Sequence, residues 1–373
     1  RVVRMPTMAD VAKRAGVAVS TVSYALSGVR PVAEETRQRI MAAIAELGYH
    51  PNLLARGLAG QRTRVIALLS PSVTTGLLQV QLEFFNAAAQ VASERGYALL
   101  LWTSPGGVTE ILRLTSEGLV EGLLLMEITL HDPRVAMLRT LGYPFCMIGH
   151  TADNAGISFV DFDFDSAARL CVQHLYDLGH RSIACLVYSP IPIESGYGPA
   201  VRSLSGIQAV RQELEYSPFI RVCEASARVA YDAVRALLEQ HPSLTAAFVT
   251  SEVLCAGATQ AVRERGLRIP EDFSIVSILS ARFAEVVSPP LTGVELPAAE
   301  MGRIGTEMLI DRLEGNVEPN QVILPAALAH GLSSCPPRPH LLGDNGSAAG
   351  MPARQRGLAY HMATRQAVEY HLG

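Results

Sequence analysis

The stretch Thr7–Gly28, TMADVAKRAGVAVSTVSYALSG, decides how the first part of the chain folds. Thr7 followed three residues later by Asp10 is typical of a capping box, in which a hydroxyl and a carboxylate satisfy free amides at a helix start. Apolar residues then recur at helical spacing until Gly16, a residue at which helices commonly end. A second helix is expected at about Val19–Leu26. The pattern predicts two short helices joined by a tight turn.

A third helix is expected from about Ala33 to Leu47, with Ile40, Ala43 and Ile44 on one face. Two short helices braced by a third form a helix-turn-helix module, whose second helix enters the major groove of DNA. We therefore expect residues 1–50 to form an all-α DNA-binding head. Residues 51–62 follow as a hinge, too short and too rich in glycine to form a stable helix alone.

Charge is distributed unevenly along the chain. Its formal net charge is −4, yet residues 1–62 hold nine basic and four acidic side chains, whereas the remaining 311 residues hold 22 and 31. A basic head on an acidic body predicts a polyanionic partner for the head alone.

The composition excludes several classes of protein. With 373 residues, 49% hydrophobic and 18% charged, the chain is long and apolar enough for a sizeable core. Its longest apolar runs are too short to cross a bilayer, and the N-terminus has no secretory signal pattern. The cysteines are scattered, at positions 146, 171, 185, 223, 255 and 335. We expect a cytoplasmic protein with no membrane span, disulfide framework, metal or cofactor.

Strands and helices alternate from Arg64 to about Ser334. Strands are expected at 65–69, 98–102, 122–126, 145–148, 183–187, 246–250 and 274–278, and helices at 79–95, 166–179, 202–215, 231–240, 254–266 and 297–314. Repeated βα units predict parallel sheets with helices on both faces. Because the count is too large for one small sheet, two linked lobes are expected, with a ligand site in the cleft where strands end.

The expected boundaries follow from this alternation. Residues 63–334 form the body, with lobe 1 at about 63–160 and 292–320 and lobe 2 at about 161–291 and 321–334. Residues 335–373 are rich in proline and glycine and are expected to be a disordered tail.

The sequence resembles the LacI/GalR family of bacterial transcriptional regulators. The resemblance begins at residues 7–28 and continues through VAEETRQRIMAAIAELGYHPN and NLLARGL, then reappears in the body at QHLYDLGHRSIACL, AVRERGLRIPEDFSIVS and SPPLTGVELPAAEMG. It implies a homodimer, a pseudo-palindromic double-stranded operator, and a body of two parallel-sheet lobes similar to periplasmic binding proteins. The function it implies is sequence-specific DNA-binding regulation, as a repressor.

The resemblance also implies which head residues meet DNA. Base edges would be reached by Val19, Ser20 and Tyr24, and phosphates by Thr21, Ser23 and Ser27; the remaining contacts would come from Thr7, Thr36, Tyr49, Asn52 and Ala55. This division is physically sensible, since phosphate contacts set the register and base contacts read the sequence. Tyr24 stands where some relatives carry arginine, and it cannot make a bidentate guanine contact. The alternative for Tyr24 is packing against the third helix.

Leu58 is the most specific hinge residue under this resemblance. In the family, this leucine of each subunit is wedged into a central minor-groove step, and the kinked DNA gains contact with the protein. The alternative is an apolar side chain in an ordinary linker. Ala18 and Ala33 depart from the family because they stand where serine or threonine usually caps the second and third helices.

The expected effector pocket departs from the family further. Ser203 stands three residues before Gly206, where sugar- and purine-binding members carry a gripping arginine, and Arg202 is one place earlier. One position turns a helical side chain by about 100°, so Arg202 is expected to miss the cleft. Leu279 replaces the matching aspartate, and Phe164 replaces the usual asparagine.

These losses remove the bidentate groups that hold vicinal hydroxyls. The candidate effector-binding residues are Ser70, His150, Phe164, Ser203, Ser251, Glu252 and Leu279. We expect either a small-molecule effector that is not a simple sugar or a regulator that needs no effector. The alternative is that Arg202, His150 or Glu252 substitutes for the missing groups.

Two other classes of function compete. No nucleophile elbow, P-loop or HExxH motif supports an enzyme, and His180 fits a structural helix end better than a catalyst. Asp161, Asp163 and Asp165 alternate on an expected strand, which favours a solvated cleft rim over a metal site. A solute-binding protein would share the body, but the basic head and hinge argue against it.

Overall fold

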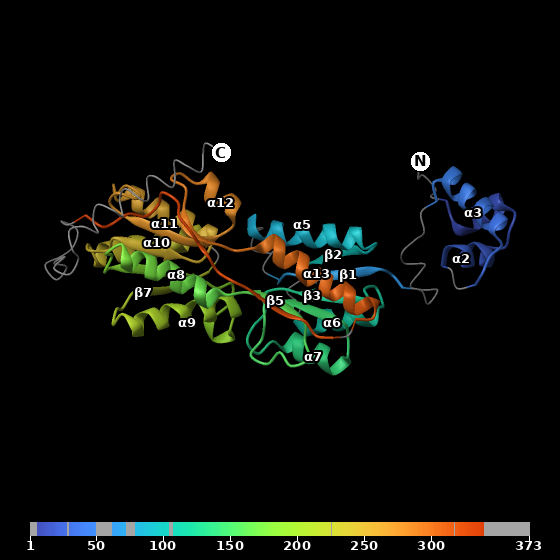
Figure 1. Ribbon diagram of the computed structural model, residues 1–373, viewed down its shortest axis with the longest axis horizontal. Coiled ribbons are helices and arrows are strands. Elements are labelled where there is room, and N and C mark those ends of the chain that lie inside the picture. Colours follow the sequence, from blue (N-terminus) through green and yellow to red (C-terminus); the bar gives the residue numbers. More distant parts are fainter. Residues whose placement is uncertain are drawn as a thin grey trace. The chain divides into compact units, whose positions relative to one another are not determined.

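Figure 1 shows the computed structural model, which describes residues 6–27, 30–49, 62–71, 79–103, 107–224, 226–316 and 318–338. These residues fall into two compact units. One is formed by residues up to Val65 together with Leu112–Glu121, and the other by the described remainder.

The head contains the three predicted helices, α1 (Met8–Ala15), α2 (Val19–Ser27) and α3 (Glu34–Leu47). The capping box of α1 is formed: the Thr7 hydroxyl accepts from the Asp10 amide at 3.3 Å, and the Thr7 amide donates to the Asp10 carboxylate at 2.8 Å. The left-handed Gly16, with φ of 67°, then ends α1 and allows α2 to begin three residues later.

The head is held together by one small apolar core. All three helices contribute fully buried aliphatic side chains, Val11, Val22 and Ile40. The expected lack of a cap holds for α3, since Ala33 makes no side-chain hydrogen bond to its first amides.

Lobe 1 is built on a six-stranded sheet in the order β11-β5-β4-β3-β1-β2. The strands are β1 (Val65–Leu69), β2 (Ala98–Trp102), β3 (Gly122–Leu125), β4 (Phe145–Ile148), β5 (Phe159–Phe162) and β11 (Gln321–Leu324), and the helices are α5 (Gln79–Glu94), α7 (Pro133–Leu141) and α13 (Ala298–Glu314). The helix α6 (Gly107–Ser116) spans the division between the two compact units. Strands β1, β3, β4, β5 and β11 pair in parallel. α5 and α13 lie side by side (Figure 1), and a side chain at Gly302 would clash with the Phe84 carbonyl.

Lobe 2 repeats the plan with a second six-stranded sheet in the order β12-β10-β9-β8-β6-β7. The strands are β6 (Ile183–Tyr188), β7 (Phe219–Cys223), β8 (Ala246–Val249), β9 (Ser274–Leu279), β10 (Thr292–Glu295) and β12 (Leu328–Ala329), and the helices are α8 (Phe164–Asp177), α9 (Gly198–Glu213), α10 (Ala227–Gln240), α11 (Glu252–Glu264), α12 (Ala281–Val286) and the short 3₁₀ turn η2 (Ile193–Ser195). Alternate residues of β6 point to opposite faces. Cys185 and Val187 share a core with α8 and α9, and Ala184 and Leu186 share one with α10 and α11.

The chain crosses between the lobes a few residues later than predicted. β10, expected in lobe 1, pairs in parallel with β9 of lobe 2, and β11, expected in lobe 2, pairs in parallel with β5 of lobe 1. β10 thus pairs along β9, and β11 along β5, before the chain passes to the other lobe. The two boundaries drawn at 292 and 321 are corrected accordingly, to about 296 and 325.

The first residues of the expected tail are placed on lobe 2. The Cys335 amide donates to the Ser274 hydroxyl at 3.0 Å, and Arg338 pairs with Asp272 at 2.9 Å. The described fold therefore extends through residue 338. The remainder of the expected tail, 339–373, lies outside the described residues. Within the described part of the chain, no helix is long and apolar enough to span a bilayer.

Candidate nucleic-acid interface and candidate ligand pocket

The second head helix, α2, has one face in the head core and one face outside it. Val22 and Ala25 are buried against α1 and α3. Val19 is 46% exposed and Ser20 is exposed. Thr21, Ser23 and Tyr24 are half-buried. The residues predicted to read base edges therefore lie on accessible parts of a helix whose other face is fixed.

Tyr24 contacts an arginine. The guanidinium of Arg30, which is exposed, lies 5.2 Å from the centre of the Tyr24 ring, a cation–π geometry. Tyr24 is not among the residues of the head core. This contact places a positive charge beside the phenol. Helical spacing does not predict it, because Arg30 lies beyond the end of α2.

Three further candidates for DNA contact take different positions. Thr7 is exposed, but its hydroxyl is occupied by the capping box. Thr36 is half-buried in the first turn of α3. Tyr49 was expected to face DNA and instead is 5% exposed, because it packs in the head core. The side chain of Ser27, and Asn52, Ala55 and Leu58, lie outside the described residues.

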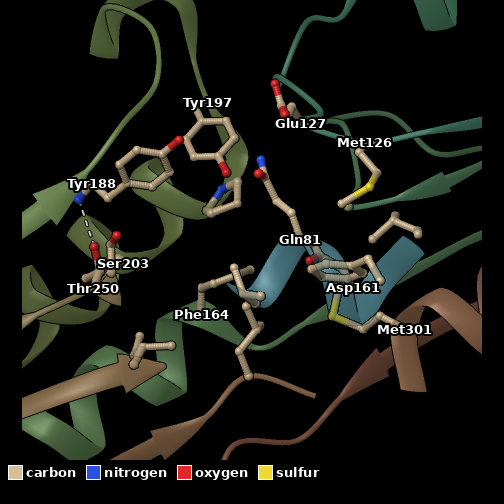
Figure 2. A pocket seen from close by; sticks show the side chains of 18 of the residues that line it. Gln81, Met126, Glu127, Asp161, Phe164, Tyr188, Tyr197, Ser203, Thr250 and Met301 are labelled. Carbon is tan, nitrogen blue, oxygen red and sulfur yellow. Dashed lines mark hydrogen bonds between the residues drawn. The ribbon is translucent and has the colours of Figure 1, made fainter. Parts of the chain in front are cut away.

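A pocket lies between the two sheets of the body, at the carboxyl ends of their parallel strands (Figure 2). It encloses about 130 Å³. Lobe 1 lines it from α5 and from the ends of β3, β4 and β5, and lobe 2 lines it from α8, α9 and the ends of β6, β8 and β9. This is the position at which ligands bind in open α/β sheets.

Five of the seven predicted effector residues line this pocket: Phe164, Ser203, Ser251, Glu252 and Leu279. Ser70 and His150 do not. Both lie directly behind it, since the Ser70 hydroxyl donates to Glu127 at 3.0 Å and His150 Nδ1 lies 2.7 Å from Asp161 Oδ2. They support lining carboxylates instead of facing a ligand.

The carboxylate of Asp161 is buried, and the side chains of His150 and Arg202 lie beside it. Besides His150, Arg202 Nη1 lies 3.6 Å from Asp161 Oδ2, and Arg202 Nη2 donates to the His150 carbonyl at 2.7 Å. Burial lowers the pKa of Arg202, and Asp161 opposes that change. Arg202 is therefore used behind the pocket wall and does not line it, as its helical position predicted.

Glu252, the first residue of α11, lines the pocket from lobe 2. Its Oε1 accepts from the Ser280 amide at 3.1 Å and from the Ser280 hydroxyl at 2.6 Å. Ser251 caps the same helix by position, yet its hydroxyl is buried and makes no hydrogen bond with the described residues.

Aromatic rings form much of the remaining wall. Tyr188 and Tyr197 meet edge to face with centroids 6.0 Å apart, and both are visible beside the cavity in Figure 2. Burial raises the pKa of the Tyr197 hydroxyl well above its ordinary value, and Tyr188, Glu127 and Asp161 add to the rise. Sequence reasoning missed both tyrosines. Tyr188 ends a strand and Tyr197 precedes a helix, and neither stands in a motif.

The alternating aspartates do not share a face. Only Asp161 is in a strand, whereas Asp163 caps α8 by accepting from the Ser166 amide at 2.9 Å and Asp165 lies in the first turn of that helix. Since the strand ends at Phe162, the expected alternation ends there too. Among the described residues, no group of histidines, cysteines and carboxylates could hold a metal.

His180 is structural, as predicted. It is 1% exposed, and its ring nitrogens lie 2.8 Å from the Thr245 hydroxyl, 3.1 Å from the Ser274 hydroxyl and 3.0 Å from the Cys335 carbonyl.

A helix-turn-helix head combined with a two-lobed body that encloses a ligand-sized pocket defines a class of ligand-responsive DNA-binding proteins. Two family models match the chain: "Bacterial regulatory proteins, lacI family" over residues 7–52 and "Periplasmic binding protein-like domain" over residues 172–334. The HTH-type transcriptional repressor PurR of Klebsiella pneumoniae (strain 342) is 32% identical over 327 residues, which cover 86% of this chain and 94% of that protein. The chain belongs to the LacI family of bacterial regulatory proteins, and it is a DNA-binding transcriptional repressor.

Solved structures agree with this assignment. The lac repressor dimer bound to operator and the anti-inducer ONPF is 26% identical, with a TM-score of 0.77, over 89% of this chain and 100% of that chain. A complex of the transcriptional regulator CelR with cellobiose is 28% identical, with a TM-score of 0.67, over 88% and 100%. The predicted family and fold class are confirmed.

Proposed function

We propose that this repressor binds a pseudo-palindromic operator as a homodimer, and that a small molecule other than a simple sugar controls its operator affinity from the pocket between the lobes. The observation that carries the proposal is the character of that pocket. The described residues that line it are mostly apolar or aromatic, and none of those is an arginine, lysine or histidine. A sugar needs several hydrogen-bonding groups arranged around its hydroxyls, and a charged bidentate group holds vicinal hydroxyls best.

The individual substitutions point the same way. Ser203 stands where the resemblance places a gripping arginine, and it is 2% exposed on the pocket wall. Leu279 stands in place of the aspartate, and Phe164 presents a ring that meets Phe162 edge to face at 5.1 Å. The alternative that Arg202 substitutes for the lost arginine is disfavoured by its ion pair with Asp161 behind the wall.

For the DNA side, we propose that α2 reads the major groove through Val19, Ser20 and Tyr24, with Thr21, Ser23 and Ser27 on phosphates. Leu58 from each subunit would wedge into the central minor-groove step. The accessible face of α2 and the excess of basic residues in 1–62 support this arrangement. Tyr49 is left out of the proposed contact set because it is buried.

Calorimetric titration of the full chain with unmodified hexoses and pentoses tests the ligand part of the proposal. We expect no heat of binding at millimolar sugar. Tight binding of a hexose or pentose would overturn it. A solute-binding protein is distinguished by DNA retardation, because deleting residues 1–62 should abolish retardation of an operator selected from genomic fragments while leaving the body folded.

A regulator that needs no effector is the second alternative. It predicts an operator dissociation constant that stays the same in the presence of any compound shown to occupy the pocket. Our proposal predicts a changed constant, and the position of the pocket between the lobes favours it, because a ligand held there contacts both lobes.

A further inference from the structure

Glu252 is buried, and among the described residues only one of its two carboxylate oxygens accepts a hydrogen bond. The residue is 6% exposed, and both Ser280 donors bind the same oxygen, Oε1. Oε2 accepts no hydrogen bond from any described residue, and no described arginine, lysine or histidine forms an ion pair with Glu252. A buried charge of this kind is costly unless a cation or further donors reach it.

The protein itself adds negative charge around Glu252. Glu83, on α5 of lobe 1, has a raised pKa, because burial and the nearby Glu252 disfavour its ionised form and Glu295 adds to them. The Ser280 hydroxyl and Arg282 partly oppose this rise. Glu83 does not itself line the pocket, but its carboxylate on α5 lies near enough to Glu252 on α11 for the two like charges to repel each other.

Asp161, another carboxylate that lines the pocket, does not need a cation from a ligand. Asp161 is already matched by Arg202, and the two carboxylate oxygens of Asp161 accept from His150 and from the Phe162 amide. A cationic ligand group would therefore gain most beside Glu252.

An unused hydroxyl lies next to Glu252 in the chain. Ser251 is 8% exposed and lines the pocket, and its Oγ is enclosed with no hydrogen-bond partner among the described residues. A buried polar atom left unpaired costs about 1–3 kcal/mol, so a ligand that satisfies it is favoured. Ser251 and Glu252 together present two acceptors to one donor group.

The size and walls of the cavity define the rest of the ligand. Its volume of about 130 Å³ is close to the roughly 150 Å³ of an apolar protein cavity that holds a benzene molecule. Phe84, Phe164, Tyr188 and Tyr197 line it, and aromatic faces attract both hydrocarbon and cations.

We propose that the pocket binds a small organic ammonium, a protonated primary amine on a hydrocarbon body of about one six-membered ring, with its N–H groups on Glu252 Oε2 and Ser251 Oγ. This inference rests on the proposed role of the pocket as the effector site. The ammonium group reduces the repulsion between Glu83 of lobe 1 and Glu252 of lobe 2, so it favours the closed arrangement of the lobes.

The test is calorimetric titration of the full-length protein with three compounds of one shape: benzylamine, benzyl alcohol and benzoate. We expect benzylamine to bind at least tenfold more tightly than benzyl alcohol, and benzoate not to bind. Cyclohexylamine should bind like benzylamine, since the hydrocarbon body only fills the cavity. Equal or tighter binding of the alcohol or the acid, or no binding of either amine at millimolar concentration, would overturn the inference.

Two variants locate the ammonium. Glu252→Gln should lower benzylamine affinity at least tenfold and leave benzyl alcohol within twofold, and Glu239→Gln, an exposed glutamate on α10, should change neither. Because Glu252 also holds Ser280, Ser251→Ala is measured in parallel and should lower benzylamine affinity several-fold in a folded protein. Unchanged amine affinity in both pocket variants would contradict the assignment.

These outcomes separate the ligand from its role. If benzylamine binds through Glu252 and operator affinity does not change, the ligand class stands and the proposed control of DNA binding fails. If benzylamine is rejected and a neutral ring compound binds and shifts operator affinity, the proposed function stands and the ammonium assignment fails.

Discussion

Ala33 begins α3 without a side-chain cap, with φ of −53° and ψ of 136°. These angles suit a capping serine, whose hydroxyl would accept from the amide of Glu35 or Thr36. We expect Ala33→Ser to stabilise the head by about 1 kcal/mol. Hydrogen exchange of the α3 amides in the full chain measures this. Ala42→Ser, on an exposed site within α3, is the matched control and should slow none of them.

One buried and one half-buried histidine, His180 and His174, predict acid sensitivity of the body. Burial lowers the pKa of His180 to about 4, and burial followed by the neighbouring His330 lowers the pKa of His174 to about 4. In the unfolded chain the pKa is about 6.5, so between about pH 6.5 and 4 the unfolded state binds more protons. The free energy of unfolding should fall as pH drops through this window, by on the order of 2–3 kcal/mol for each histidine.

Urea unfolding at pH 7.5, 6 and 5 measures this dependence. His180→Gln should be less stable than the original protein at pH 7.5 but should lose less stability on acidification. His131→Gln, on an exposed site, is the control. An unchanged slope in His180→Gln would rule out His180 as a source of the sensitivity.

For single residues, contacts between neighbours in the sequence could be predicted better than contacts between residues that are far apart in it. The Thr7–Asp10 capping box and the position of Arg202 follow from helical spacing and are found. Tyr49 was placed on DNA and is buried, because the head core needs a large apolar group after α3. The pairing of Arg30 with Tyr24 depends on three-dimensional packing, which helical spacing does not report. The same holds for the Glu252 oxygen that accepts no hydrogen bond from the described residues.

Among the elements, α8 and α9 approach closely because Gly206 has no side chain. A Cβ at this position would lie 2.2 Å from the Asp165 carbonyl and 3.2 Å from the Ala168 Cβ. Gly to Ala in an exposed helix usually stabilises by up to about 1 kcal/mol. Here we expect Gly206→Ala to destabilise the chain by about 1–3 kcal/mol, since α8 must move away from α9.

Thermal unfolding followed by circular dichroism checks this change. Ser205→Ala is the matched control, because Ser205 is the exposed neighbour on the same helix and its replacement should be neutral or slightly stabilising. A Gly206→Ala protein as stable as the Ser205→Ala protein would contradict the close packing of the two helices.

Most elements could be predicted from the sequence, and the failures have a common cause. The strands β1, β2 and β4 have the predicted bounds, because each is a short uninterrupted apolar run. β10 and β11 were assigned to the wrong lobes. These two short strands have too little hydrophobic pattern to indicate which strand they pair with. Their position depends on which sheet has an unpaired edge strand nearby, and the local sequence does not report this.

For the whole body, three crossings join the lobes: from β5 to α8, from β10 to α13 and from β11 to β12. Two residues that line the pocket, Phe164 and Leu296, lie at the first two of these crossings. Closure of two lobes about a few connecting residues is a common response to a ligand in such folds. A ligand at Glu252 is therefore well placed to alter how the lobes meet. The proposed departure from sugar recognition follows from the sequence, whereas the proposed ammonium site depends on the packing around Glu252, which the sequence does not report.

The most direct test of the account is the operator affinity of the full-length protein with and without saturating benzylamine, measured by fluorescence anisotropy on an operator fragment at fixed salt. We predict that benzylamine changes the dissociation constant at least fivefold for the original protein and less than twofold for Glu252→Gln. An operator affinity that stays the same while calorimetry shows benzylamine bound would contradict control of DNA binding from this pocket.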